Sequence, residues 1–152
     1  MKVQGRTYPG SKDLTKLVPT GRTGLDMKDL IYSLHCLGVR CEEHPNTTAH
    51  AIFNFLLDNP LQVVVFCHQM LAGTYGQYRR CESGHYACAV FADKKRGDIY
   101  TADSGFRYPR WGVMNLKVFD GVFFDNLIDD PKKIVSGWAL SIPITAHNIH
   151  IE

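Results

Sequence analysis

A histidine and an aspartate at the two ends of a predicted β-hairpin could together form the basic half of a nucleophilic site. Two runs with alternating, β-branched and aromatic residues, 84–91 and 98–103, enclose the turn 94–97, a pattern typical of a hairpin. We expect His85 at the start of the first strand and Asp103 at the end of the second, side by side and within about 3.2 Å. A carboxylate on one imidazole nitrogen fixes the tautomer and leaves the other nitrogen for proton transfer. The pair could instead be a buried aspartate that a histidine merely satisfies.

Hydrophobic periodicity predicts the elements that must position this pair. Apolar residues at helical spacing indicate two helices, one from the N-cap Asp26 to Gly38 and one over 46–58. The valine-rich run 61–68 is typical of a fully buried strand. Further elements are a short edge strand over 39–43, a short helix around 116–124 and a closing strand over 134–144. We therefore expect an α+β fold, with an antiparallel sheet of four to six strands and two or three helices packed on one side.

Length and composition indicate one domain of ordinary character. A chain of 152 residues suits a single domain over 1–152, with a core of about 14–143 and short flexible termini. A net charge of +2 is too small to argue for a nucleic-acid partner. No apolar run approaches the roughly 20 residues that span a membrane, and no signal peptide is evident, so we expect no membrane insertion. Five cysteines without a pairing pattern favour a reducing, cytoplasmic compartment.

Two predicted loops border the candidate pair. The first, 69–83, is the longest polar segment and leads to His85, and the second, 104–112, follows Asp103. Such loops either carry specificity or merely connect strands. Their aromatic side chains could contact a ligand or pack over the sheet edge: Tyr75, Tyr78, Phe106, Tyr108 and Trp111.

Cysteine and histidine side chains near the hairpin offer a metal site as an alternative. By donor type, Zn²⁺ suits four of them: Cys67, His68, Cys81 and His85. Their spacing matches no compact zinc finger, and adjacent strand residues point to opposite faces, so we expect no metal and no cofactor. Cys36 and Cys88 are expected to be small buried hydrophobes. Cys81 is the one thiol placed to approach the imidazole, but as a loop residue it lacks the helix N-terminus that activates a thiolate.

The order of these motifs resembles that of the papain-like cysteine peptidases, and in particular of those that process the double-glycine leader peptides of bacteriocins. The glycine-led His85, the short turn and the strand ending Ile99-Tyr100-Thr101-Ala102-Asp103 carry the likeness. Other segments that match, within about 14–143, are Gly21-Arg22-Thr23-Gly24-Leu25, Leu37-Gly38-Val39, the strand 60–66, the helix 116–124 and Gly137-Trp138-Ala139-Leu140. The resemblance implies the sheet half of a papain-like domain, a peptide or protein as substrate or partner, His85 as general base and Asp103 as its orienter.

One departure from that family concerns the nucleophile. In these peptidases a catalytic cysteine opens a long helix that precedes the segments above, and an oxyanion-stabilising glutamine stands shortly before it. Here the first cysteine is Cys36 and the one earlier glutamine is Gln4. Two functions remain open: a thiol peptidase whose nucleophile is missing because the chain is truncated, split or engineered, or an inactive homologue that binds a peptide or protein. In both cases we expect the isolated chain to hydrolyse no peptide.

Overall fold

The computed structural model describes residues 2–3, 6–7, 26–72, 79–103, 111–126 and 134–144. The chain divides into two compact units, one of residues 1–41 with 143–152 and one of residues 42–142. The expectation of a single domain over 1–152 stays a prediction. Among the described helices, none has both the length and the apolar character needed to cross a membrane.

Among its described residues, the smaller unit contains one well-capped helix and one short strand pair. Strand β1 (Lys2–Val3) pairs antiparallel with β2 (Arg6–Thr7). Helix α2 (Met27–Cys36) begins after Asp26, whose carboxylate accepts the Asp29 N–H at 2.7 Å, and it is followed by Gly38 at a φ of 71°. Both ends lie as the sequence predicts, because a short acidic side chain satisfies the first N–H groups and glycine tolerates the left-handed region.

The prediction that Cys36 is buried is wrong. Its side chain is exposed on the last turn of α2. The apolar stripe of this helix runs through Leu30, Leu34 and Leu37, and Cys36 lies off that stripe, so its position in the helical repeat overrides its apolar character.

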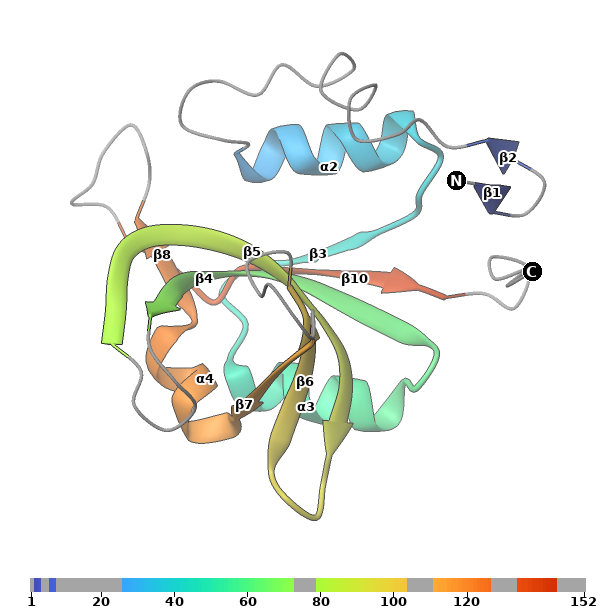
Figure 1. Ribbon diagram of the computed structural model, residues 1–152. Helices are drawn as coiled ribbons and strands as arrows, with labels where there is room; N and C mark the ends of the chain where they lie inside the picture. The colour runs from blue at the N-terminus through green and yellow to red at the C-terminus, as the bar shows by residue number, and fades with distance from the viewer. Residues whose placement is uncertain are drawn as a thin grey trace. The chain divides into compact units, whose positions relative to one another are not determined.

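The larger unit is built on a six-stranded antiparallel sheet, which confirms the α+β expectation (Figure 1). In order across the sheet, the strands are β3 (Glu42–His44), β10 (Ala139–Pro143), β4 (Gln62–Ala72), β5 (Arg79–Asp93), β6 (Asp98–Ala102) and β7 (Trp111–Asn115). A separate two-stranded sheet pairs β8 (Phe124–Asn126) with β9 (Ile134–Ser136). The expected edge strand is thus present as β3, at one margin of the six-stranded sheet.

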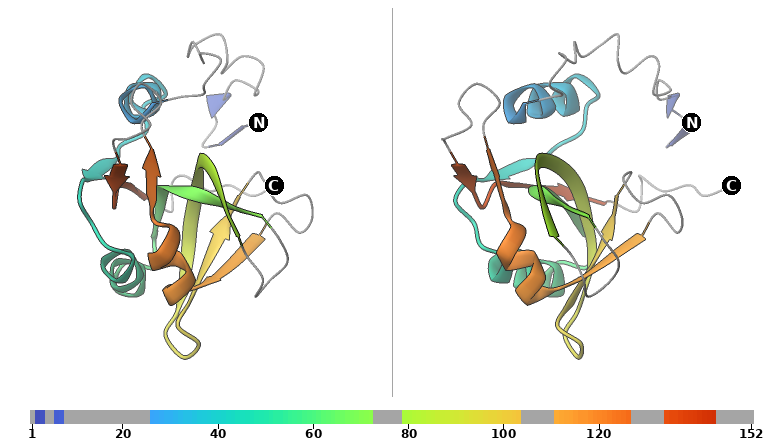
Figure 2. Two further views of the ribbon diagram at one scale, coloured as in Figure 1. Left: turned by 90° about the vertical axis from the view of Figure 1, so that its left-hand side faces the viewer. Right: turned by 60° about the vertical axis from the view of Figure 1, so that its left-hand side comes forward.

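Two helices cover one face of this sheet, α3 (Ala49–Asp58) and α4 (Leu116–Val122) (Figures 1 and 2). Thr48 caps α3 by accepting the Ala51 N–H at 3.1 Å, and Asn115 caps α4 by accepting the Lys117 N–H at 3.1 Å. The core between helices and sheet is rich in aromatic and aliphatic side chains, among them Ile52, Phe53, Leu56, Val64, Phe66, Ile99, Phe119 and Val122. Phe66 lies at its centre, with its ring centroid 4.8 Å from that of Phe119.

The predicted hairpin is present as β5 and β6. The Asp93 carboxylate accepts the N–H groups of Lys95 and Arg96 at 2.9 and 3.2 Å, which orders the turn. Gly97 completes the turn at a φ of 68° and donates its N–H to the Asp93 carbonyl at 2.8 Å. These contacts fix Asp93 opposite Asp98 as the first pair of the ladder.

A one-residue bulge in β5 changes the register of this hairpin. From the turn, Ala92 pairs with Ile99 and Phe91 with Tyr100, but the next pair joins Ala89 to Thr101. Val90 is therefore the extra residue on β5. The burial pattern agrees, since Ala89 and Ala92 are both buried although three positions separate them. Figure 1 shows β5 curving strongly along its length, as bulged strands do.

Two strand boundaries differ from the predictions. The segment 69–83 is not one loop: β4 runs on to Ala72 and β5 begins at Arg79, so His85 lies within β5 and not at its start. Polar side chains did not prevent pairing there, because the ladder is made by the backbone. The predicted strand 134–144 is two strands, β9 and β10, separated at Gly137. The predicted loop residues 73–78 and 104–110 lie outside the described residues.

Gly137, at the break between β9 and β10, has a backbone conformation and a close contact that favour glycine. Its φ is 69°, and a Cβ built on it would collide with the Thr47 carbonyl oxygen. Its own carbonyl accepts the Thr47 N–H at 2.7 Å. We expect Gly137→Ala to lower the free energy of unfolding by at least about 2 kcal/mol, because both the backbone and Thr47 must shift.

The matched control for this substitution is Gly121→Ala, in helix α4, where a Cβ meets nothing within 4 Å. There alanine should raise the free energy of unfolding by about 0.5–1 kcal/mol. Urea denaturation of both variants measures the difference, and equal effects of the two substitutions would contradict the close approach at Gly137.

Candidate functional site

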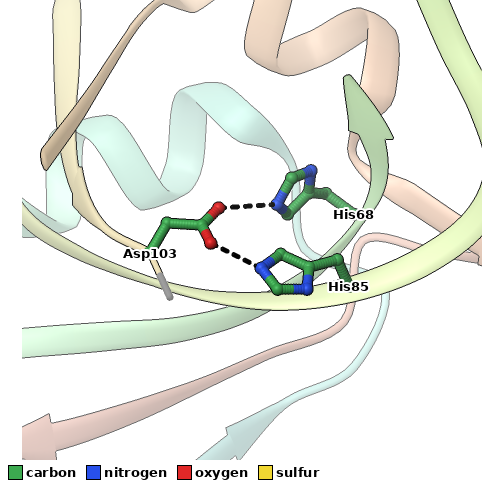
Figure 3. A group of neighbouring side chains, drawn as sticks. All are labelled: His68, His85 and Asp103. Atoms are coloured by element: carbon green, nitrogen blue, oxygen red, sulfur yellow. Dashed lines mark hydrogen bonds and ion pairs between the residues drawn. The ribbon is translucent and has the colours of Figure 1, made fainter. Parts of the chain in front are cut away.

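Three polar side chains meet on the helix-covered face of the sheet, two from neighbouring strands and one from the residue after a third strand (Figure 3). His68 lies in β4, His85 in β5, and Asp103 directly follows β6. His68 and His85 are paired across the β4–β5 ladder. The face is set by alternation, since Val64 and Phe66 precede His68 at two-residue spacing and both belong to the core.

The predicted His85–Asp103 contact is confirmed. Nε2 of His85 lies 2.6 Å from Oδ1 of Asp103. A carboxylate only accepts hydrogen bonds, so the neutral imidazole carries its proton on Nε2. Nδ1 then holds the free lone pair, which is the arrangement that a general base requires.

The sequence predicts that the two residues lie directly opposite each other, but in the structure they are diagonal neighbours. Cys88 pairs with Ala102, so the same register continued by one residue sets Asp103 opposite Ala87, two positions from His85. Diagonal neighbours of this kind are about 7–8 Å apart at the backbone, and the imidazole and carboxylate together span that distance.

Burial differs sharply within the cluster. His68 and Asp103 are 4% and 8% exposed, whereas the side chain of His85 is 22% exposed. Asp103 is thus held inside the protein, while His85 reaches both the carboxylate and the surface. This is the distribution that suits an orienting acid and a reacting base.

His68 is a functional candidate that the sequence reasoning placed only in a different, cysteine-containing ligand set. Its Nε2 lies 3.9 Å from Oδ2 of Asp103, beyond hydrogen-bond length but within ion-pair range. Its ring packs edge-on to that of His85, with centroids 5.6 Å apart, and 5.2 Å from that of Phe66. Alternation along the buried strand 61–68 could have found it, since His68 shares the parity of Val64.

Two described cysteines of the same unit, Cys67 and Cys88, do not join the cluster. Cys67 pairs with Tyr86 and Cys88 with Val65, so alternation puts both on the sheet face opposite to His85. This separates Cys67 from the histidines of the alternative zinc ligand set. Cys81 lies in β5, and its side chain lies outside the description. The four described cysteines, Cys36, Cys41, Cys67 and Cys88, form no disulfide with one another.

The titration of the Cys88 thiol is displaced by its surroundings. Burial raises its pKa from 9.0 to about 11, because the apolar surroundings disfavour the thiolate. A raised pKa is the opposite of activation. Cys88 is half-buried, less than the full burial that the sequence predicts.

The predicted aromatic ligand contacts are not tested. Tyr75, Tyr78, Phe106 and Tyr108 lie outside the described residues. Trp111 opens the edge strand β7, but its side chain belongs to the undescribed part. Their proposed role therefore stays a prediction.

Comparison with known proteins assigns no family: the sequence matches no family model, and no curated protein is significantly similar to it. The chemistry of the site must therefore be argued from its own geometry.

The hydrogen bond between Asp103 and His85 predicts a defined tautomer. In the wild-type chain, ¹⁵N-edited NMR of the imidazole should find the His85 proton on Nε2. Asp103→Ala should give a mixture of both tautomers because the acceptor is lost, and Asp103→Asn should favour the Nδ1 tautomer, because its amide can donate to Nε2. A wild-type proton on Nδ1 would rule out the base assignment.

The raised pKa of Cys88 predicts slow alkylation. At pH 9 about one Cys88 thiol in a hundred is ionised in the folded chain. We expect iodoacetamide to modify Cys88 at least about tenfold more slowly in the folded protein than in guanidinium, as followed by peptide mass spectrometry. The exposed Cys36 is the internal control, with similar rates in both states. Fast labelling of Cys88 in the folded chain would show that its thiol is accessible and ionised.

Proposed function

We propose that this chain is a papain-like, cysteine-peptidase type of protein in which His85 is the general base and Asp103 its orienter. The observation that carries the proposal is the 2.6 Å contact between His85 Nε2 and Asp103 Oδ1, which leaves Nδ1 for a reacting group. The resemblance of the motifs around both residues supports the same reading, and so does the antiparallel sheet that presents them.

The proposed reaction assigns one step to each residue. Nδ1 of His85 would take the proton of a thiol, and the thiolate would attack the carbonyl carbon of a peptide. The imidazolium, held by Asp103, would then return the proton to the leaving amine as the peptide bond breaks. Water would release the acyl group in a second, base-assisted step. The thiol would come from another chain or segment, since Cys67 and Cys88 lie on the opposite face of the sheet.

A second candidate function is a non-catalytic peptide- or protein-binding module on the same fold. The raised pKa of Cys88 and the position of Cys67 both favour it, because neither thiol can serve His85. Strand β7 is the margin of the sheet beside β6, and an extended peptide can add to such a margin by backbone pairing. Both candidates act on a peptide or protein in a reducing, cytoplasmic compartment, without a nucleic-acid partner.

Two substrates, a peptide and its activated ester, test the base function of His85 independently of a thiol nucleophile. A leader-like peptide with a Gly-Gly site should not be cleaved above background, because removal of one triad member costs several orders of magnitude. The p-nitrophenyl ester of the same leader has a far better leaving group, so the His85–Asp103 pair alone should accelerate its hydrolysis. We expect a rate at least about tenfold above that of His85→Ala, measured by nitrophenolate release.

Two controls complete this experiment. His50→Ala removes an exposed histidine of α3 and should leave ester hydrolysis unchanged. Fluorescence anisotropy should give a micromolar-range Kd for the intact peptide. N-methylation of alternate peptide groups should weaken this binding if the peptide adds to a sheet edge.

Ester hydrolysis that does not depend on His85 would contradict its role as a base. Thiol-dependent cleavage of the amide, lost in His85→Ala, would contradict the expected inactivity and make Cys81 the nucleophile to test.

A further inference from the structure

His68 has no role in the proposed general-base reaction, yet it points at the same carboxylate as His85. Figure 3 shows the two carboxylate oxygens of Asp103 directed at two different imidazoles, Oδ1 at His85 and Oδ2 at His68. In each histidine it is Nε2 that faces the carboxylate. Two imidazole nitrogens and one carboxylate oxygen thus converge on one point, and the three donor atoms lie within 4.8 Å of one another.

We propose that His68, His85 and Asp103 form a binding site for a divalent transition metal such as Zn²⁺. Two histidines and one carboxylate are a ligand set that zinc and ferrous iron use in proteins. Hard cations such as Mg²⁺ and Ca²⁺ prefer oxygen ligands and water, so two buried imidazoles disfavour them. The sequence predicts no metal for a ligand set with two cysteines and without Asp103, whereas the structure brings Asp103 to the two histidines.

The geometry requires only small side-chain movements. Zinc lies about 2.0–2.2 Å from nitrogen and oxygen ligands, which sets donors about 3.4 Å apart in a tetrahedral site. With Oδ1 as the oxygen ligand, the 2.6 Å contact of His85 must open by about 0.8 Å. His68 Nε2, which lies 3.9 Å from the other oxygen, Oδ2, must move toward the ion, and all three donor atoms already lie within 4.8 Å of one another. Side-chain rotation supplies both shifts, while the paired strands β4, β5 and β6 hold the backbone.

Charge and burial favour a cation at this point. Asp103 is buried and brings one negative charge, while neutral imidazoles bring two further lone pairs. A buried carboxylate is stabilised by a metal ion as it is by a paired base. The partly exposed side chain of His85 gives the ion a route from solvent, and a fourth position there remains for water.

Metal binding and base function exclude each other. The metal takes the Nε2 lone pair of His85, so the imidazole proton must move to Nδ1, the atom that accepts a proton in the proposed reaction. The ion would therefore act as an inhibitor of the His85–Asp103 pair. The site itself needs only the three ligands and does not depend on the proposed function.

The test is direct binding of Zn²⁺ to the purified chain by isothermal titration calorimetry at neutral pH. We expect one site that His85→Gln weakens at least about tenfold. His85 is the least buried ligand, so this variant is the one best suited to stay folded, and circular dichroism without metal checks it. His50→Gln, on the exposed side of α3, should bind as the wild type does.

A second described pair of donors needs its own control. Nε2 of His35 lies 3.7 Å from Sγ of Cys41, and such a pair also attracts zinc. His35→Gln should leave the affinity unchanged. Binding that survives His85→Gln but is lost in His35→Gln would overturn the proposal. The absence of binding up to Zn²⁺ concentrations of about 100 μM, roughly the weakest affinity expected of three converging ligands, would also overturn it.

Co²⁺ supplies a readout that does not depend on a variant. Bound by His68, His85 and Asp103, it should show the visible bands of nitrogen and oxygen coordination without a thiolate charge-transfer band. A thiolate band would place the ion on a cysteine and refute the assignment. Because neither experiment measures turnover, a failed ester hydrolysis would leave the metal result intact, and a failed metal titration would leave the base assignment intact.

Discussion

The bulge at Val90 is the constraint on which the site depends. The turn fixes Asp93 opposite Asp98, and an unbulged ladder from there would pair Cys88 with Asp103. Paired residues share a face of the sheet, so Asp103 would then lie with Cys88, opposite to His85. One extra residue in β5 moves Asp103 opposite Ala87 and so onto the face of both histidines. A single register step thus decides whether the chain has a polar cluster or an isolated buried carboxylate.

This dependence explains which parts of the site the sequence could predict. The strand patterns, the turn and the spacing of His85 and Asp103 predicted a contact that is present at 2.6 Å. The bulge itself has no local signal, because Val90 and Phe91 are as suitable for a regular strand as their neighbours are. Direct pairing was therefore expected, and the diagonal arrangement was not. The prediction of the contact is nevertheless correct, because the His85 and Asp103 side chains together are long enough to meet in either the direct or the diagonal arrangement.

Elements of the fold that local sequence determines were predicted well, and those that depend on tertiary contacts were not. Helices α2 and α3 have a capping Asp26 or Thr48 and an apolar stripe, so their positions follow from local sequence. The extension of β4 and β5 through Gln69 and Arg80 does not follow from local sequence. Polar residues pair in a β-ladder whenever the backbone of a partner strand is available. Gly137 is intermediate: glycine marks a break in a strand pattern, but the approach of Thr47 that requires it is a tertiary contact.

The position of Asp103 between two imidazoles sets what the cluster can do. Its two oxygens face different histidines, so the carboxylate can orient His85 for proton transfer while His68 lies beside it, or all three can hold one cation. Both arrangements satisfy a negative charge that the protein has taken out of water, and both use Nε2 of His85. They differ in the proton: the base state keeps it on Nε2, and the metal-bound state moves it to Nδ1. Solvent, substrate or ion reaches the cluster at the partly exposed side chain of His85, because the other two residues are buried.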